Sequence, residues 1–158
     1  MRRAIVILED YAMYQTTMER WVKRWAQPGI LVIQARTVDA AQEALRDPRS
    51  WPTNDNLRNA AENATVVVGV VIDLLMEDSE DKVTGLGRQG TNFIEWVLSQ
   101  PEAKHLPLII LSAYKEMLYE ASKVLSRHSF QSLPQVVNRS TDFNEIREPF
   151  RSFLKSLP

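Results

Sequence analysis

Val66-Val-Val-Gly-Val-Val-Ile72 is an uninterrupted apolar run rich in β-branched residues, and Asp73 follows it directly. The run lacks the two-residue alternation of a half-exposed strand, so it predicts a strand covered on both faces, as in the middle of a parallel sheet. In open α/β sheets, ligands bind at the carboxyl ends of the strands. Asp73 is therefore a candidate functional residue, although aspartate is also common as a turn residue after a strand.

Apolar runs and helical periodicities alternate along the rest of the chain. Including the central strand, we expect strands at 3–8, 30–35, 66–72, 108–111 and 134–137. We expect helices at 12–25, 37–45, 91–99, 115–127 and 142–157. Thr37 is the expected N-cap of the second helix, and Pro149 should kink or divide the last one. This order predicts an α/β fold with a doubly wound, five-stranded parallel sheet and helices on both faces.

The length of 158 residues suits one domain with a full hydrophobic core. We interpret residues 1–158 as a single domain with insertions near 46–64 and 77–90, where polar or glycine-rich stretches interrupt the pattern. The second insertion comes soon after Asp73. It is either a solvated loop or a loop that covers the site or recognises a partner.

Composition excludes several classes of function. The formal net charge is -1, so the chain lacks the basic surface that nucleic-acid binding needs. It has no cysteine, which excludes disulfides, thiolate metal sites and a cysteine nucleophile. No apolar segment approaches the roughly 20 residues that span a bilayer. We therefore expect a cytoplasmic protein that binds neither nucleic acid nor membranes.

Polar side chains stand where four of the predicted strands end. Glu9 and Asp10 follow the first strand, Asp73 the central one, Ser112 the fourth and Arg139 the last. Since parallel strands present their carboxyl ends at one edge of the sheet, these side chains should gather there.

This set, in this order, resembles the receiver domain of two-component response regulators. The resemblance runs from Ile5-Val-Ile-Leu-Glu-Asp10, through Asp73-Leu-Leu-Met76 and Leu108-Ile-Ile-Leu-Ser-Ala113, to Val136-Val-Asn-Arg-Ser-Thr-Asp-Phe143. It implies a flavodoxin-like, three-layer fold. It also implies a stand-alone signalling domain, not an enzyme in the usual sense, which is phosphorylated in a magnesium-dependent reaction and signals by altered protein–protein binding.

The resemblance assigns a role to each polar residue at the strand ends. Asp73 is the implied phosphoacceptor, and Ser112 and Arg139 are implied to contact the phosphoryl group. The implied Mg²⁺ ligands are Glu9, Asp10, Asp73 and the backbone carbonyl of Leu75. The residue types suit these roles, because Mg²⁺ prefers oxygen ligands and phosphoryl transfer depends mostly on positioning and charge neutralisation.

Two positions depart from the family pattern. Arg139-Ser140 stands where the family has lysine followed by a proline in a cis peptide. Arginine keeps the charge but is longer and planar, and without proline a cis bond would cost about 3 kcal/mol. Val136 stands where many members have an aromatic residue that turns inward on activation. Any switch should therefore signal through another group.

The resemblance implies a sensor histidine kinase or phosphotransfer protein upstream, and a downstream protein or a second copy of the chain as the output. The alternative is a pseudo-receiver, an interaction module that is never phosphorylated. Arg139-Ser140 and Val136 favour this alternative, and the intact Glu9, Asp10, Asp73 and Ser112 oppose it. A third hypothesis, a Mg²⁺-dependent phosphohydrolase with Asp73 as nucleophile, ranks last because Leu75 stands where haloacid-dehalogenase-like phosphatases carry a second aspartate.

Overall fold

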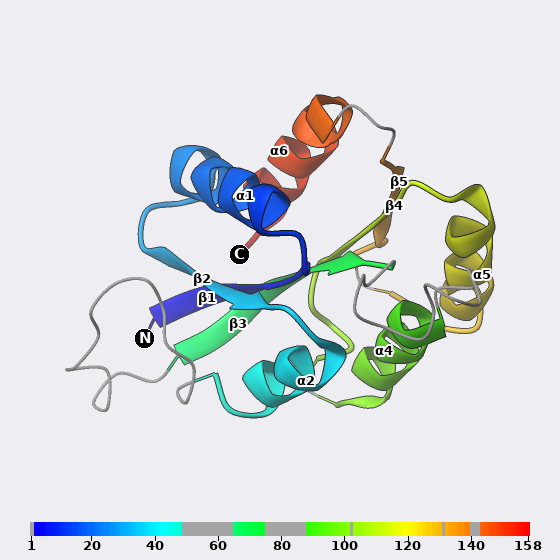
Figure 1. Ribbon diagram of the computed structural model, residues 1–158. Coiled ribbons are helices and arrows are strands. Elements are labelled where there is room, and N and C mark those ends of the chain that lie inside the picture. Colours follow the sequence, from blue (N-terminus) through cyan, green and yellow to red (C-terminus); the bar gives the residue numbers. More distant parts are fainter. Residues whose placement is uncertain (1, 49–64, 75–87, 102, 131, 140–142) are drawn as a thin grey trace.

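The structure of the chain is a computed structural model that describes residues 2–48, 65–74, 88–101, 103–130, 132–139 and 143–158. Within these ranges, five parallel strands form one sheet in the order β2-β1-β3-β4-β5 (Figure 1). The strands are β1 (Arg2–Leu8), β2 (Ile30–Ala35), β3 (Thr65–Asp73), β4 (Leu108–Ser112) and β5 (Gln135–Asn138). The helices are α1 (Ala12–Trp25), α2 (Val38–Arg46), α4 (Arg88–Ser99), α5 (Lys115–Leu125), the 3-10 helix η2 (Phe143–Ile146) and α6 (Arg147–Ser156).

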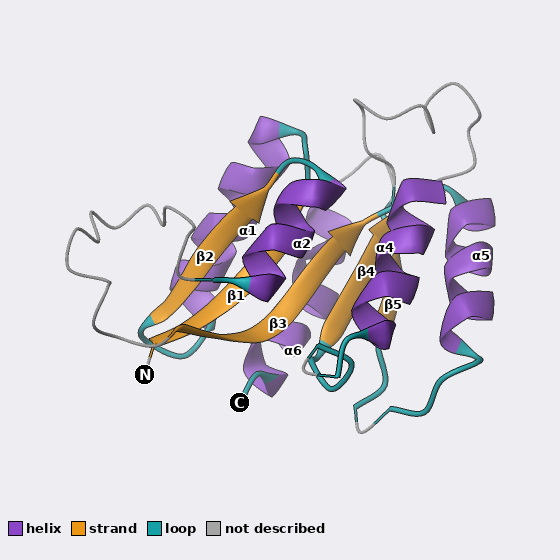
Figure 2. Cartoon of the chain, turned by 90° about the horizontal axis from the view of Figure 1, so that it is seen from below, coloured by secondary structure: helices purple, strands orange, loops and turns teal. Residues whose placement is uncertain are grey.

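Helices cover both faces of the sheet. Helices α1 and α6 lie on one face, and α2, α4 and α5 lie on the other (Figures 1 and 2). The strand order runs from β1 outward to β2 on one side and through β3 to β5 on the other, so the direction of winding reverses between β1 and β3. This is the doubly wound, three-layer fold predicted from the sequence, and it places the ligand-binding crevice at the carboxyl ends of β1 and β3.

The central strand β3 is apolar from Val66 to Ile72 because both faces of its interior are covered. Val67, Val70 and Ile72 pack among the residues under α2, α4 and α5. Val68 and Val71 pack among those under α1 and α6. Every position of β3 from Val67 to Asp73 is buried, which explains the absence of alternation in the sequence.

Gly69 allows helix α6 to approach this strand. The pairing between β1 and β3 slips by one residue after Ala4, a β-bulge that puts Val68 and Gly69 on the same face. A Cβ atom on Gly69 would lie 2.6 Å from Leu157 Cδ2 and 3.1 Å from Phe153 Cζ. The glycine therefore leaves room for the C-terminal helix to pack directly on the sheet.

Most predicted elements are confirmed, and the last helix is the main correction. Thr37 caps α2, since its side chain accepts a hydrogen bond from the Ala40 N–H at 3.1 Å. In place of one helix at 142–157, the structure has η2 followed by α6, and residue 142 lies outside the described residues. Pro149 causes no break, because it lies in the first turn of α6, where a missing N–H costs no intrahelical bond.

Neither predicted insertion is described in full. Helix α4 begins at Arg88, so residues 88–90 of the insertion predicted at 77–90 are helical. Residues 75–87 and 49–64 lie outside the described residues. In the part of the chain that the structure covers, no helix is both long and apolar enough to cross a membrane.

Candidate functional site

The register of the sheet brings Glu9 and Asp73 to adjacent positions. Leu8, the last residue of β1, pairs with Ile72 of β3, so the next residue of each strand emerges at the same level. On the other side of β1, the ladder with β2 continues past the end of the strand, because the Glu9 N–H donates to the carbonyl of Ala35 in β2 at 3.0 Å. The predicted pairing of these two acids is thus a direct result of strand register.

The register on the other side of Asp73 brings Arg139 to the same edge. Asp73 pairs with Leu111 of β4, and Ser112 pairs with Asn138 of β5. The backbone N–H of Arg139 then donates to the Ser112 carbonyl at 2.7 Å, which fixes the arginine backbone just beyond β5. Residues that are 130 positions apart in the sequence, Glu9 and Arg139, therefore meet at one site.

Arg139 bonds to both of the buried acids. Its Nη1 lies 2.6 Å from Asp73 Oδ2 and 3.3 Å from Glu9 Oε2. The side chains of both acids are 1% exposed, and that of Arg139 is 12% exposed. Because the three groups are withdrawn from water, these charge-assisted hydrogen bonds are stronger than surface ion pairs, and removing one partner would leave a buried charge uncompensated.

Burial, together with a hydrogen bond to Asp73 and the charge of Asp73, raises the pKa of Glu9 to about 10. A hydrogen bond from the Tyr11 N–H, 3.0 Å from Glu9 Oε1, and the positive charge of Arg139 act in the opposite direction. At neutral pH, Glu9 therefore holds a proton and shares it with the Asp73 carboxylate. Protonated Glu9, the Asp73 carboxylate and the Arg139 guanidinium together carry no net charge.

A pocket of about 390 Å³ opens beside these groups. Its lining comes from the β1–α1, β4–α5 and β5 ends and consists of Glu9, Asp10, Tyr11, Met13, Tyr14, Ala113, Tyr114 and Arg139. Tyr11, Met13 and Tyr114 are exposed, so the mouth of the pocket is apolar while its interior is charged. Such a combination is typical of a site that receives a polar group from a partner.

The predicted magnesium ligands are only partly assembled. Glu9 and Asp73 lie together, and half-buried Asp10 lines the same pocket. Among the described residues, however, no group of three acidic or histidine side chains is close enough to hold a metal ion. Leu75, the predicted carbonyl ligand, lies outside the described residues.

The donor atoms nevertheless fit a hard cation in kind, since two buried carboxyl groups present oxygen atoms side by side. A metal binds carboxylates in their ionised form, so binding would release the proton held by Glu9. It would also have to compete with the Arg139 guanidinium, which bonds to both acids.

Ser112 ends β4 as predicted, but its hydroxyl has protein partners of its own. Its Oγ accepts a hydrogen bond from the Tyr114 N–H at 3.1 Å and lies 3.6 Å from Met117 Sδ, to which it donates. The side chain is fully buried and is not part of the pocket lining. A rotation about its Cα–Cβ bond would be needed for the hydroxyl to serve a group bound in the pocket.

Two residues of the site had no predicted role in it. The Tyr14 ring lies against the guanidinium of Arg139, with 4.6 Å between the ring centroid and Cζ. The buried side-chain amide of Gln15 donates to the Glu9 backbone carbonyl. Both lie in the first turn of α1, directly after the acids, and this position is the signal that could have identified them.

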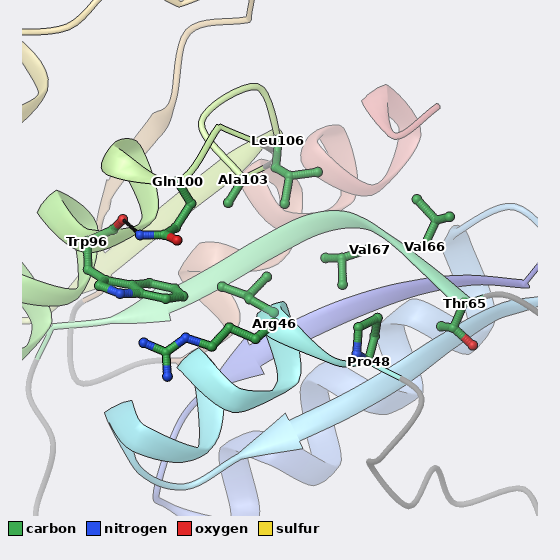
Figure 3. A pocket seen from close by; sticks show the side chains of 10 residues that line it. Arg46, Pro48, Thr65, Val66, Val67, Trp96, Gln100, Ala103 and Leu106 are labelled. Atoms are coloured by element: carbon green, nitrogen blue, oxygen red, sulfur yellow. Dashed lines mark hydrogen bonds between the residues drawn. The ribbon is translucent and has the colours of Figure 1, made fainter.

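A second pocket, of about 330 Å³, lies at the opposite end of the sheet (Figure 3). Arg46 of α2 stacks on Trp96 of α4 there, with Cζ 5.1 Å from the ring centroid. Pro48 and Thr65, which flank residues 49–64, both line it. No carboxylate is among its described lining residues, and six residues of β3 separate Val67 of its lining from Asp73, roughly 20 Å, so it is not part of the acidic site.

Comparisons with known proteins bear on the fold. No protein-family model matches the sequence, and no curated protein matches it. Solved structures do: the phosphorylated cyanobacterial phytochrome response regulator RcpA is 14% identical, with a TM-score of 0.63 over 100% of this chain and 99% of that chain. The Mn²⁺-bound response regulator Rcp1 is 13% identical, with a TM-score of 0.63 over 98% of each chain.

The receiver domain of the sensor histidine kinase PA1611 from Pseudomonas aeruginosa PAO1 is 12% identical, with a TM-score of 0.57 over 99% of this chain and 100% of that chain. That domain has a magnesium ion coordinated in its active-site cleft. At these identities the likeness shows the fold, and the predicted fold class is confirmed.

Proposed function

We propose that this chain, which has the fold of response-regulator receiver domains, is a signalling domain that is switched by phosphorylation of Asp73. The observation that carries the proposal is the position of Asp73. Its carboxylate ends the central strand at the point where the winding of the sheet reverses, and it is buried beside Glu9 and Arg139, both of which line a pocket. This is where an open α/β sheet binds its ligand.

The proposed reaction transfers a phosphoryl group to Asp73. A carboxylate oxygen of Asp73 forms a bond to phosphorus while the bond between phosphorus and the leaving atom of the donor breaks, and the donor leaves with that electron pair. The product is an acyl phosphate on Asp73. Mg²⁺, held by Glu9, Asp10 and Asp73, would supply charge neutralisation for this transfer.

Arg139 and Ser112 are the proposed phosphoryl contacts. The guanidinium of Arg139 already bonds to an Asp73 oxygen, so it needs only a small movement to meet a phosphoryl group there. Its planar fork suits phosphate, to which arginine binds with two parallel hydrogen bonds. Ser112 ends the neighbouring strand and offers a hydroxyl donor once it leaves Met117.

Phosphorylation would increase the negative charge beside Arg139. The acyl phosphate carries about -1.5 to -2 charges in place of the single charge of the Asp73 carboxylate, and its oxygen atoms would compete with Glu9 for the Arg139 guanidinium. The contact between Arg139 and Glu9, now 3.3 Å long, links β5 to β1 and would be weakened. Such a shift between two arrangements of β5 and its neighbours is the proposed signal to a downstream protein or to a second copy of the chain.

The phosphodonor is proposed to be a sensor histidine kinase or a phosphotransfer protein. Exposed Tyr11, Met13 and Tyr114 surround the pocket, with exposed fractions of 42%, 58% and 49%. Large apolar side chains gathered at a pocket mouth suit docking of a protein surface better than docking of a free polar metabolite.

One observation favours the pseudo-receiver as a second candidate function. Arg139 already neutralises Asp73, and the described residues assemble no three-carboxylate metal site. If Arg139 is never displaced, the domain would bind partners without a phosphorylation cycle.

The test is to incubate the full chain with Mg²⁺ and acetyl phosphate and to measure its intact mass promptly. We expect one phosphoryl adduct on the wild type and none on Asp73→Asn. The matched control is Asp39→Asn, an exposed aspartate in the first turn of α2, which should form the adduct like the wild type. A wild type that binds Mg²⁺ but forms no adduct with any donor would favour the pseudo-receiver.

A further inference from the structure

The Arg139 guanidinium is enclosed between an aromatic ring and two acids. Its Cζ lies 4.6 Å from the centroid of the Tyr14 ring, while its Nη1 bonds to Asp73 and Glu9. We propose that Tyr14 is a positioning residue that holds Arg139 on the acidic pair as the counter-cation of the site, so that a divalent cation binds there only by displacing the guanidinium. This inference rests on the proposed function, which places the cation at the same acids.

Contacts that do not involve Arg139 hold the Tyr14 ring in place. The N–H groups of Tyr14 and Gln15 both donate to the Tyr11 carbonyl, at 3.0 and 3.1 Å, and start helix α1. The Tyr11 ring packs edge-on against the Tyr14 ring, with 4.7 Å between centroids and 76° between planes. The Gln15 amide ties the same turn to the Glu9 carbonyl. The ring is therefore held by the same turn that carries Glu9.

Arginine suits this arrangement and lysine does not. A guanidinium is planar and weakly hydrated, so one face can stack on an aromatic ring while the N–H groups at its edge bond to carboxylates. An ammonium group is compact and strongly hydrated, and it offers no flat face to the ring. The Tyr14 ring therefore favours a guanidinium over an ammonium group at position 139.

The same oxygen atoms cannot serve two cations at full strength. Asp73 Oδ2 and Glu9 Oε2 are the atoms that Arg139 contacts, and a divalent cation between the acids would use them as ligands. Two positive charges a few ångströms apart in a buried site repel strongly. Loosening Arg139 from Tyr14 should therefore make room for the metal and raise its apparent affinity.

The test is a calorimetric titration with Mg²⁺ alone on four full-length proteins: wild type, Tyr14→Phe, Tyr14→Leu and Arg139→Met. We expect Tyr14→Leu to tighten Mg²⁺ binding on the order of fivefold, the size of a partly buried cation–π contact. Arg139→Met should tighten it further, and Tyr14→Phe, which keeps the ring, should match the wild type. A merely structural role for Tyr14 would weaken binding or leave it unchanged.

A second readout needs no metal. In side-chain ¹⁵N NMR spectra, solvent exchange of the Arg139 Nε–H should be slow in the wild type and Tyr14→Phe, and faster in Tyr14→Leu. If Mg²⁺ binds equally to all four proteins, the inference is overturned while the proposed function stands. If Mg²⁺ binds to none of them, the metal-dependent function fails, and the exchange rates decide the inference: equal rates in all three arginine-containing proteins overturn it.

Discussion

Glu9→Gln should make the protein more stable, by an amount that grows as the pH rises. In the unfolded chain, Glu9 has an ordinary pKa near 4.5, and in the folded protein burial and Asp73 raise it to about 10. Between these two values, the folded protein holds a proton that the unfolded chain has released. The wild type therefore loses stability as pH rises through this window, by up to about 1.4 kcal/mol per pH unit.

Glutamine removes this loss. Its amide can donate to Asp73 as protonated Glu9 does, and its oxygen can still accept from the Tyr11 N–H, but it does not titrate. We expect the free energy of unfolding of Glu9→Gln to exceed that of the wild type by roughly 3 kcal/mol at pH 7 and by much less at pH 5.

Urea unfolding of both proteins from pH 5 to pH 8 measures this difference. Glu116→Gln is the matched control, because it replaces an exposed glutamate and should shift stability by less than about 0.5 kcal/mol at any of these pH values. Parallel pH profiles for the wild type and Glu9→Gln would show that Glu9 is ionised in the folded protein.

Gly90→Ala should both destabilise the fold and slow phosphorylation. Gly90 is buried in the first turn of α4, against the residue that follows Asp73. A Cβ atom there would lie 2.7 Å from the Cα and 2.8 Å from the carbonyl oxygen of Leu74. These are backbone atoms, so the clash cannot be relieved by a side-chain rotation, and either α4 or the end of β3 has to move.

The stability cost of such overpacking is roughly 1–3 kcal/mol, which outweighs the gain in helix propensity of at most about 1 kcal/mol. Displacing Leu74 also moves the Asp73 carboxylate from its neighbours. Since small misplacements of reacting groups are costly, we expect the rate of phosphorylation by acetyl phosphate to fall on the order of tenfold or more.

Asn92→Ala is the control for Gly90→Ala, because it places alanine at an exposed position of the same helix. It should keep the wild-type phosphorylation rate and stability. Equal rates for Gly90→Ala and Asn92→Ala would mean that the close approach of α4 to Leu74 has no part in placing Asp73.

The sequence was sufficient to predict the sheet, because a strand that is buried on both faces has a continuous apolar sequence. Val66–Ile72 has no polar position, and polar site residues follow this strand and three of the other four at the same edge. Once the strands are parallel and in register, the meeting of Glu9, Asp73 and Arg139 follows from geometry. Each of these residues was therefore predictable from its place at a strand end.

Side-chain directions were not predictable in the same way. Asp10 and Ser112 also follow strand ends, yet Asp10 forms no three-carboxylate group with the described acids, and the Ser112 hydroxyl bonds to Met117. Such rotamers depend on contacts between elements that are far apart in the sequence. Tyr14 illustrates the same limit, because its place in the first turn of a helix after Glu9 and Asp10 does not show that the ring contacts Arg139, which comes from the far end of the chain.

Pro149 shows a different limit, that of local rules. Proline inside a helical pattern predicts a break, but the first turn of a helix tolerates it. The boundary between η2 and α6 falls at Ile146. This residue is fully buried in the hydrophobic cluster between the sheet and helices α1 and α6. Tertiary packing therefore places the boundary, and the proline only has to be compatible with it.

The most direct measurement of the central claim is to locate the phosphoryl group itself. The protein is treated with Mg²⁺ and acetyl phosphate, the acyl phosphate is reduced with borohydride, and the digested peptides are sequenced by mass spectrometry. Reduction converts a phosphorylated aspartate to homoserine and leaves other aspartates unchanged. We expect homoserine at position 73 and at no other aspartate. Homoserine at another position, with Asp73 unmodified, would contradict the assignment of Asp73 as the phosphoacceptor.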